Sequence, residues 1–209
     1  MNRYRVIRAA AAIGVIAMSL AMGAALRPLL PGGALPAAPV LTATEIGFVQ
    51  DMVAHHGQAL ALVDRLDPAA DPAVRALARQ IADTQRTELG LLLGWLRLAD
   101  APVTAAEPMA WMRPVGAHRH AGVDLAHHHS TMPGMASTAE LDALAAARGG
   151  PAEVLFLRLM QRHHHGGIEM AAAADARLDG GHVERAARDM ITGQGREAGL
   201  LGLLLDRRA

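Results

Sequence analysis

The sequence predicts an all-α protein built as a four-helix bundle. Hydrophobic residues make up 52% of the 209 residues, but aromatic residues only 2%. The apolar content is therefore mostly Ala, Leu, Val and Met, which favour helices over strands. The chain also repeats itself: two stretches of helical period, related by the 108-residue offset between Met52 and Met160, each read as a helical hairpin. Two hairpins joined by a long crossover pack most economically around one core.

Residues 1–27 have the composition of an export segment. Three arginines among the first eight residues precede an uninterrupted apolar run over 9–26, which is the order of a charged n-region and a hydrophobic h-region. The length of the run suits either a cleaved signal peptide or an N-terminal membrane anchor, and both stay open. In either case the arginines remain inside and the rest is exported. We therefore expect an extracytoplasmic protein (surface, periplasmic or secreted), with its C-terminus outside if the membrane anchor is retained.

A linker and the first hairpin follow. Residues 28–41 are rich in Pro, Gly and Ala and have no period, which predicts a linker. The first hairpin is expected over 42–99 and begins with a Thr-x-x-Glu capping box at Thr42. Two Asp-Pro pairs end its first helix, and Pro72 suits the first position of the second helix.

A long crossover separates the two hairpins. Residues 100–136 have no helical period and are rich in His and Met. A Ser-x-x-Glu capping box at Ser137 predicts a short helix over 137–149, ended by a Gly-Gly pair. The second hairpin is expected over 151–206, with its first helix starting at Pro151. Residues 42–206 then form one ferritin-like four-helix bundle.

Both hairpins carry the same polar residues within their apolar faces. The repeated motifs are Met-x-x-His-His, at Met52/His55/His56 and Met160/His163/His164, and Gln-x-x-Glu, at Gln85/Glu88 and Gln194/Glu197. Burying an imidazole, an amide and a carboxylate costs several kcal/mol unless the groups are paired or bind something. One interpretation pairs His55 with Glu88, and likewise His163 with Glu197. The other is a metal site, because Met and His three or four positions apart on a helix face one point.

The donor types favour copper as the metal. Thioethers suit Cu(I) and imidazoles suit Cu(II), and the chain has no cysteine; iron, manganese and zinc stay open. The predicted ligands are Met52, His55, His56, Glu88, Met160, His163, His164, Met170 and Glu197, with His127, His128, His129, Met132 and Met135 of the crossover as weaker candidates. The crossover would collect metal loosely, or it is merely a solvated loop.

Several other function classes are disfavoured. The 20 basic and 20 acidic residues cancel, so the chain offers no basic patch for nucleic acid. The sequence contains no nucleophile-and-base set, no Gly-rich phosphate loop and no zinc-protease signature, and we predict no enzyme. Two alternatives stay open: a di-metal oxidoreductase with His55, His163 and both glutamates as ligands, and a structural or partner-binding bundle without metal. Self-association and, through an uncleaved N-terminus, membrane attachment also stay open.

A known family shares this pattern. The residues that carry it are Phe48, Met52, His55, His56, Ala59, Gln85, Glu88, Met132-Pro133-Gly134-Met135, Phe156, Met160, His163, His164, Met170, Gln194 and Glu197. Over residues 44–205 the chain resembles the exported bacterial family called domain of unknown function three hundred and five. The resemblance implies a ferritin-like four-helix fold outside the cytoplasm. For the characterised members it implies copper binding and resistance rather than catalysis.

The second hairpin departs from this pattern. His165 and the pair Gly166-Gly167 follow its His-His motif, and each glycine is expected to weaken the helix by about 1 kcal/mol. Met170 stands where the first half has Leu62, so the two halves are not equivalent ligand sets. Di-iron proteins of this architecture use Glu-x-x-His. Here Met takes the place of that Glu, which disfavours a di-iron enzyme.

Overall fold

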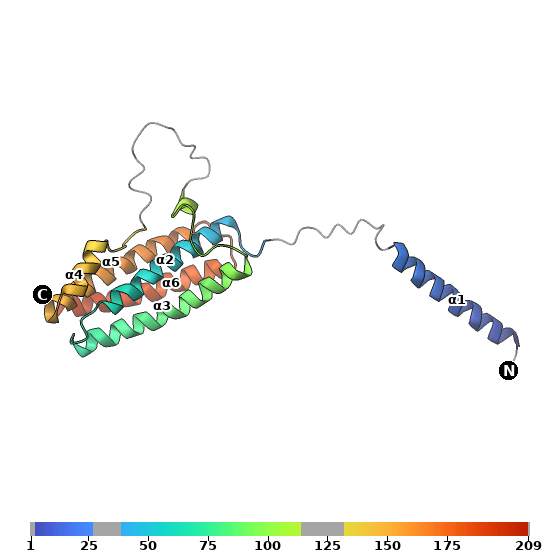
Figure 1. The fold of residues 1–209 in the computed structure, drawn as a ribbon, viewed down its shortest axis with the longest axis horizontal. Helices are drawn as coiled ribbons and strands as arrows, with labels where there is room; N and C mark the ends of the chain where they lie inside the picture. Colours follow the sequence, from blue (N-terminus) through green and yellow to red (C-terminus); the bar gives the residue numbers. More distant parts are fainter. Residues whose placement is uncertain (1–2, 27–38, 114–131, 209) are drawn as a thin grey trace, which may run out of the picture. The chain divides into compact units, whose positions relative to one another are not determined.

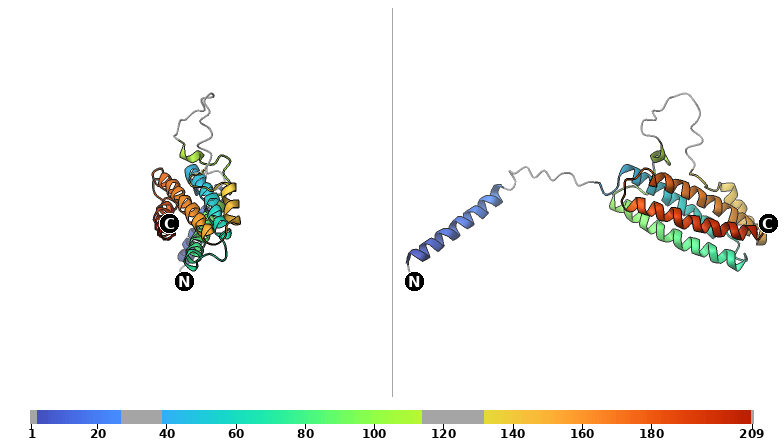
Figure 2. Two further views of the ribbon diagram at one scale, coloured as in Figure 1. Left: turned by 90° about the vertical axis from the view of Figure 1, so that its left-hand side faces the viewer. Right: turned by 180° about the vertical axis from the view of Figure 1, so that it is seen from behind.

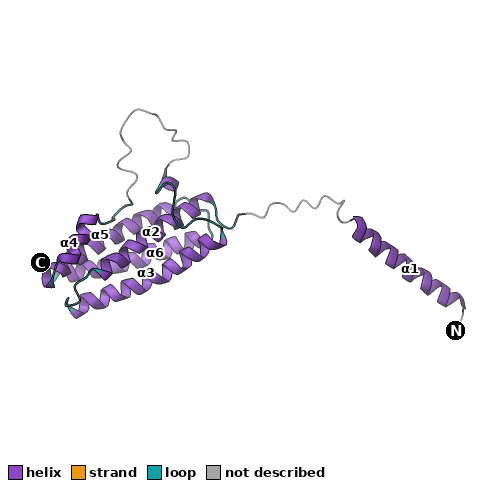
Figure 3. Cartoon of the chain, in the orientation of Figure 1, coloured by secondary structure: helices purple, strands orange, loops and turns teal. Residues whose placement is uncertain are grey.

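The computed structural model describes residues 3–26, 39–113 and 132–208, and within these ranges the chain forms six α-helices and one short 3-10 helix without a strand (Figure 3). The predicted all-α class is confirmed. The chain divides into two units, Met1–Ala38 and Pro39–Ala209. The first contains α1 (Arg3–Leu26). No helix in the described part of the chain is long and apolar enough to span a bilayer, and the export role of residues 1–27 stays a prediction.

The first hairpin consists of α2 (Ala43–Asp64) and α3 (Pro72–Leu98). Thr42 caps α2, because its hydroxyl accepts from the Glu45 nitrogen while the Glu45 side chain accepts from the Thr42 nitrogen. Asp71 caps α3 by accepting from the Ala73 nitrogen at 2.7 Å. These local bonds satisfy backbone donors that a helix leaves unpaired at its first turn.

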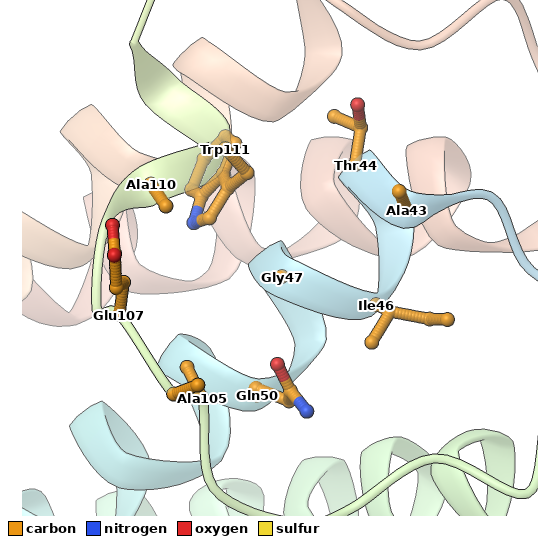
Figure 4. Close-up of a pocket in the computed structure, with 10 residues that line it drawn as sticks. Ala43, Thr44, Ile46, Gly47, Gln50, Ala105, Glu107, Ala110 and Trp111 are labelled. Atoms are coloured by element: carbon orange, nitrogen blue, oxygen red, sulfur yellow. The ribbon is translucent and has the colours of Figure 1, made fainter. Parts of the chain in front are cut away.

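The start of the crossover is bonded to α2. Its 3-10 helix η1 (Ala110–Met112) follows Met109, and the backbone nitrogen of Met109 and Nε1 of Trp111 both donate to Oδ2 of the buried Asp51, at 2.7 and 2.8 Å. A Cβ added to Gly47 would lie 2.9 Å from the Trp111 Cβ. The absence of a side chain at Gly47 therefore lets Trp111 pack closely against α2 (Figure 4). Burial raises the pKa of Asp51.

The second hairpin follows a short helix. This helix, α4 (Thr138–Ala146), has its own capping box at Ser137. It is followed by α5 (Gly149–Asp175) and α6 (His182–Asp206). Helix α5 begins two residues before the expected Pro151. The Gly149 nitrogen donates to Asp67 Oδ2 at 2.8 Å, and this bond from the first hairpin caps the early start.

The four long helices of the second unit pack as two hairpins that meet along α2 and α5 (Figures 1 and 2). Their core contains two apolar clusters, one that includes Ala59 and Phe156 and one that includes Met52 and Met170. Along each of the four helices, the repeated His, Gln and Glu residues lie between the residues of one cluster and those of the other. The polar residues therefore form one layer across the middle of the bundle.

Candidate metal centre

The polar layer receives side chains from all four long helices. Its members are His55 and His56 of α2, Gln85 and Glu88 of α3, His163 and His164 of α5, and Gln194 and Glu197 of α6. All of them are buried except Glu88, whose side chain is 20% exposed, against 6% for Glu197. The sequence repeat thus produces a repeated polar arrangement inside the core.

The second histidine of each motif pairs with the glutamate of its own hairpin. Nε2 of His56 donates to Oε2 of Glu88 at 2.5 Å, and Nε2 of His164 donates to Oε2 of Glu197 at 2.8 Å. The expected pairing of glutamate with His55 and His163 is therefore wrong. Successive helical residues point about 100° apart, so only one histidine of each pair faces the helix that carries the glutamate.

The first histidine of each motif faces its counterpart instead. The rings of His55 and His163 lie 3.8 Å apart between centroids, with 33° between their planes. His163 Nε2 donates to the His55 backbone oxygen at 3.1 Å, and His55 Nε2 donates to the Pro133 oxygen at 3.2 Å. Residues at the same position of the repeat therefore touch each other where the two hairpins meet.

Burial keeps these two imidazoles neutral. Desolvation is the largest cause that lowers the pKa of His55 to about 3, and it also lowers the pKa of His163 well below 6.5. Neighbouring histidines lower both values further. Because a carbonyl oxygen only accepts, each Nε2 must carry the proton. Each neutral ring therefore has its lone pair on Nδ1.

The layer contains buried polar atoms without partners. Among the described residues, Nδ1 of His55, His56, His163 and His164 has no hydrogen-bond partner, and neither do Gln85 Oε1 and both amide atoms of Gln194. Leaving such an atom unsatisfied costs about 1–3 kcal/mol. A histidine that donates through one nitrogen to a carbonyl or carboxylate, with the other nitrogen free, has the arrangement usual for a metal ligand. Each histidine therefore keeps one buried ring nitrogen available as a donor.

The predicted methionine ligands separate between the two clusters. Met52 and Met170 are fully buried and share one cluster, whereas Met160 is buried in the other. Met132 and Met135 are half-buried in the turn that precedes α4. The weaker candidates His127, His128 and His129 lie outside the described residues.

Within 3–26, 39–113 and 132–208, no three His, Asp or Glu side chains are grouped so that they could hold a metal ion. In this arrangement, at most two His, Asp or Glu side chains could bind the same metal ion. Any further protein ligand would have to be a methionine sulfur. Cu(I) accepts thioethers. A carboxylate-rich di-iron centre needs six His and Glu ligands together, and this arrangement does not supply them.

Some functional contacts have no signal in the motifs. Gly167 gives room to Gln194, since a Cβ there would lie 3.0 Å from the Gln194 Cδ and closer still to its Oε1. The glycines expected only to weaken α5 thus have a packing role. Asp51 carried one usable signal: its counterpart in the repeat is the apolar Leu159. A charged residue at a position that is apolar in the other half marks a contact specific to one half.

One pocket beside the described start of the crossover is lined by no residue of the histidine layer. It has a volume of about 610 Å³ and is lined by the first turns of α2, including Gly47 and Gln50, and by crossover residues up to Trp111 (Figure 4). Neither His nor Met lines it. It therefore offers neither the imidazole nor the thioether donors expected for copper.

The family model described as Domain of unknown function (DUF305) matches residues 45–205. This chain belongs to the DUF305 family. The resemblance expected from the doubled motif is thereby confirmed. A search of curated proteins gives no match.

Solved structures of DUF305 proteins share this fold. A candidate secreted DUF305 protein from Streptomyces coelicolor is 36% identical, with a TM-score of 0.67, covering 79% of this chain and 92% of that one. A DUF305 fragment from Deinococcus radiodurans is 33% identical, with a TM-score of 0.63, covering 79% and 97%. CopM in its Cu(I)-bound form is 22% identical, with a TM-score of 0.58, covering 79% and 98%. At that identity, CopM supports the shared fold.

Proposed function

We propose that this DUF305 protein is an exported copper-binding protein that sequesters the ion or hands it on, for copper homeostasis or resistance. The observation that carries the proposal is the state of the four buried histidines. Each Nε2 donates to a carbonyl or carboxyl oxygen, and each Nδ1 is buried without a partner. Four buried ring nitrogens without a hydrogen-bond partner in one layer favour binding of a cation.

The donor chemistry favours copper among the cations. Imidazole nitrogen and thioether sulfur are the available donors, and the chain has no thiolate. Structures of CopM have been solved with Cu(II), Cu(I) and Ag bound, which supports the same chemistry on this fold. Iron, manganese and zinc would compete for the imidazoles but gain less from methionine.

Each residue type has a separate role in the proposed site. The imidazoles of His55, His56, His163 and His164 would bind through Nδ1, with Met52, Met160 and Met170 as the nearby source of sulfur. We assign Glu88 and Glu197 to the support of the rings behind the metal, because their Oε2 atoms already accept from His56 and His164. Collection of metal by the crossover histidines at 127–129 belongs to the proposal as well.

Export completes the proposed function. The N-terminal segment has the charge and apolar order of an export signal, and a relative at 36% identity is described as a candidate secreted protein. Outside the cytoplasm the protein would meet copper before the ion enters the cell.

A copper titration of residues 39–209, purified without a His tag, tests the proposal. We expect bound copper by elemental analysis, and a Cu(I) affinity that falls at least about tenfold in the double variant His163→Ala, His164→Ala, since both are predicted ligands. The matched control is His165→Ala, the exposed neighbour on the same helix, which should bind as the wild type does. Absence of copper, or equal affinities for all three proteins, would refute a copper site here.

A metal-free structural layer is the second candidate. It is favoured by the four hydrogen bonds from Nε2, which satisfy half of the histidine nitrogens without any ion. The two candidates differ in their response to copper, because a ligand that binds only the folded state adds about 2.7 kcal/mol at 100 times its Kd. A melting temperature unchanged by copper and by chelator would support the structural layer.

A further inference from the structure

The last residues of the crossover, 132–136, form a strap that is bonded to both central helices. On the α2 side, Gln58 Nε2 donates to the Ala136 oxygen at 2.8 Å, and the Ala136 nitrogen donates to Gln58 Oε1 at 2.6 Å. On the α5 side, Arg162 Nη2 donates to the Met135 oxygen at 3.4 Å. The strap therefore crosses the line along which the two hairpins meet.

Glycines let the strap touch α5 backbone to backbone. Gly134 has a φ of +75°, which favours glycine. A Cβ added to Gly166 would lie 2.6 Å from the Gly134 nitrogen and closer still to the Pro133 carbonyl. A side chain at position 166 would therefore push the strap away from the helix.

The strap contacts equivalent positions of the repeat, and these positions have diverged. Gly166 is the counterpart of Gln58 at the 108-residue offset of the repeat. Gln58 holds the strap with two hydrogen bonds, while Gly166 leaves it room. Glycine is unfavourable in a helix interior, so the close approach at Gly166 accounts for its presence there.

The strap also supplies a hydrogen bond that symmetry alone would not give. His163 Nε2 donates to the backbone oxygen of His55, and the symmetric acceptor for His55 would be the backbone oxygen of His163. Instead, His55 Nε2 donates to the Pro133 oxygen of the strap. The proton position on His55 thus depends on a segment outside the four helices.

We infer that the strap is a positioning element of the histidine layer: held at Gly166 and Gln58, it places the Pro133 carbonyl so that His55 keeps its proton on Nε2 and presents Nδ1 as the lone pair. For its consequence in metal binding, this inference rests on the proposed function. Pro133 and Gly166 touch no metal in this role, and they act through His55. A second-layer contact of this kind is worth about 10- to 100-fold in metal affinity.

Nitrogen-15 NMR of the metal-free full chain tests the inference directly, because protonated and unprotonated imidazole nitrogens have distinct shifts. In the wild type we expect His55 with a protonated Nε2 and a bare Nδ1. In Gly166→Ala we expect that pattern to be lost at His55 while the Glu-paired His56 and His164 keep theirs. Copper affinity should fall about 10- to 100-fold.

Matched variants separate this role from general damage to the helix. Gly150→Ala adds the same methyl group to α5 at a site where the added Cβ would have no neighbouring atom within 4 Å. It should leave the histidine nitrogen-15 signals and the copper affinity unchanged. Gln58→Ala releases the other end of the strap without adding volume, and should reproduce the His55 change if Gly166→Ala fails to fold.

Unchanged His55 signals in a folded Gly166→Ala protein, or in Gln58→Ala, would overturn the inference. So would altered His55 signals with wild-type copper affinity. A wild type that binds no copper would refute the proposed function alone, because the metal-free spectra still decide whether the strap sets the proton position on His55.

Discussion

The two His–Glu pairs offer a comparison in which one hairpin serves as the control for the other. Both pairs join a buried imidazole to a carboxyl group, His56 to Glu88 and His164 to Glu197. They differ in exposure, with 20% of the Glu88 side chain accessible to water but 6% of the Glu197 side chain. Truncating each glutamate to alanine removes the same bond from two different environments.

The loss of stability expected for each variant depends on whether water can replace the glutamate carboxylate as the hydrogen-bond acceptor. In Glu197→Ala, Nε2 of His164 loses its partner in a closed part of the core, and Nδ1 of the same ring already has none. A buried donor left unsatisfied costs about 1–3 kcal/mol, and more when its partner was charged. We therefore expect a loss of about 2–3 kcal/mol. In Glu88→Ala, water can reach the vacated position, and we expect about 1 kcal/mol or less.

Urea unfolding of the metal-free protein at pH 7, followed by far-UV circular dichroism, measures both values. The slope with urea should be the same for the three proteins, so that the midpoints report stability alone. Equal losses for the two variants would refute the argument, because exposure would then not govern the cost. A larger loss for Glu88→Ala would refute it outright.

Two further predictions concern the histidines and the methionines. Burial lowers the pKa of His55 from 6.5 to about 3, and it lowers the pKa of His163 well below 6.5. Below about pH 6.5 the unfolded chain then binds protons that the folded chain does not, and the free energy of unfolding should fall by up to about 1.4 kcal/mol per pH unit for each histidine. Urea midpoints that stay constant from pH 7 to 4.5 would contradict this. Replacing Met52 and Met170 with leucine should change stability by less than about 1.5 kcal/mol while lowering Cu(I) affinity in a chelator competition. Met190→Leu, in the same apolar cluster, is the control, and an equal loss of affinity there would remove the case for Met52 and Met170 as ligands.

The sequence predicted the features that depend on local chemistry. The capping boxes at Thr42 and Ser137 and the Pro at position 72 mark helix starts in the structure, because a cap uses bonds within one turn. The repeated His and Glu residues meet in one layer because the helical period keeps them on the inward faces. Sequence period alone therefore identified the members of the layer.

The pairing within the layer could not be predicted in the same way. Choosing between His55 and His56 as the partner of Glu88 requires the rotation of each helix about its axis, and one residue changes that rotation by about 100°. The contact of Gly166 with Pro133 joins segments brought together only by the fold. A glycine within a helical sequence does not indicate which segment packs against it. The sequence therefore predicted that Gly166 weakens α5, but not that it makes room for Pro133.

The duplication and the crossover account for different parts of this site. The duplication accounts for what is paired: the adjoining His55 and His163 rings, and one His–Glu bond in each hairpin. The differences described above have a common location, because Asp51, Gln58 and His55 all lie on α2 and all bind the crossover. The corresponding positions on α5 are Leu159, Gly166 and His163. His163 donates to His55 of α2 instead, and Gly166 contacts the described part of the crossover through close backbone packing. The symmetric set pairs the two hairpins, whereas the asymmetric set fixes the crossover to α2 and, through the bond from His55 to Pro133, also acts on the histidine layer.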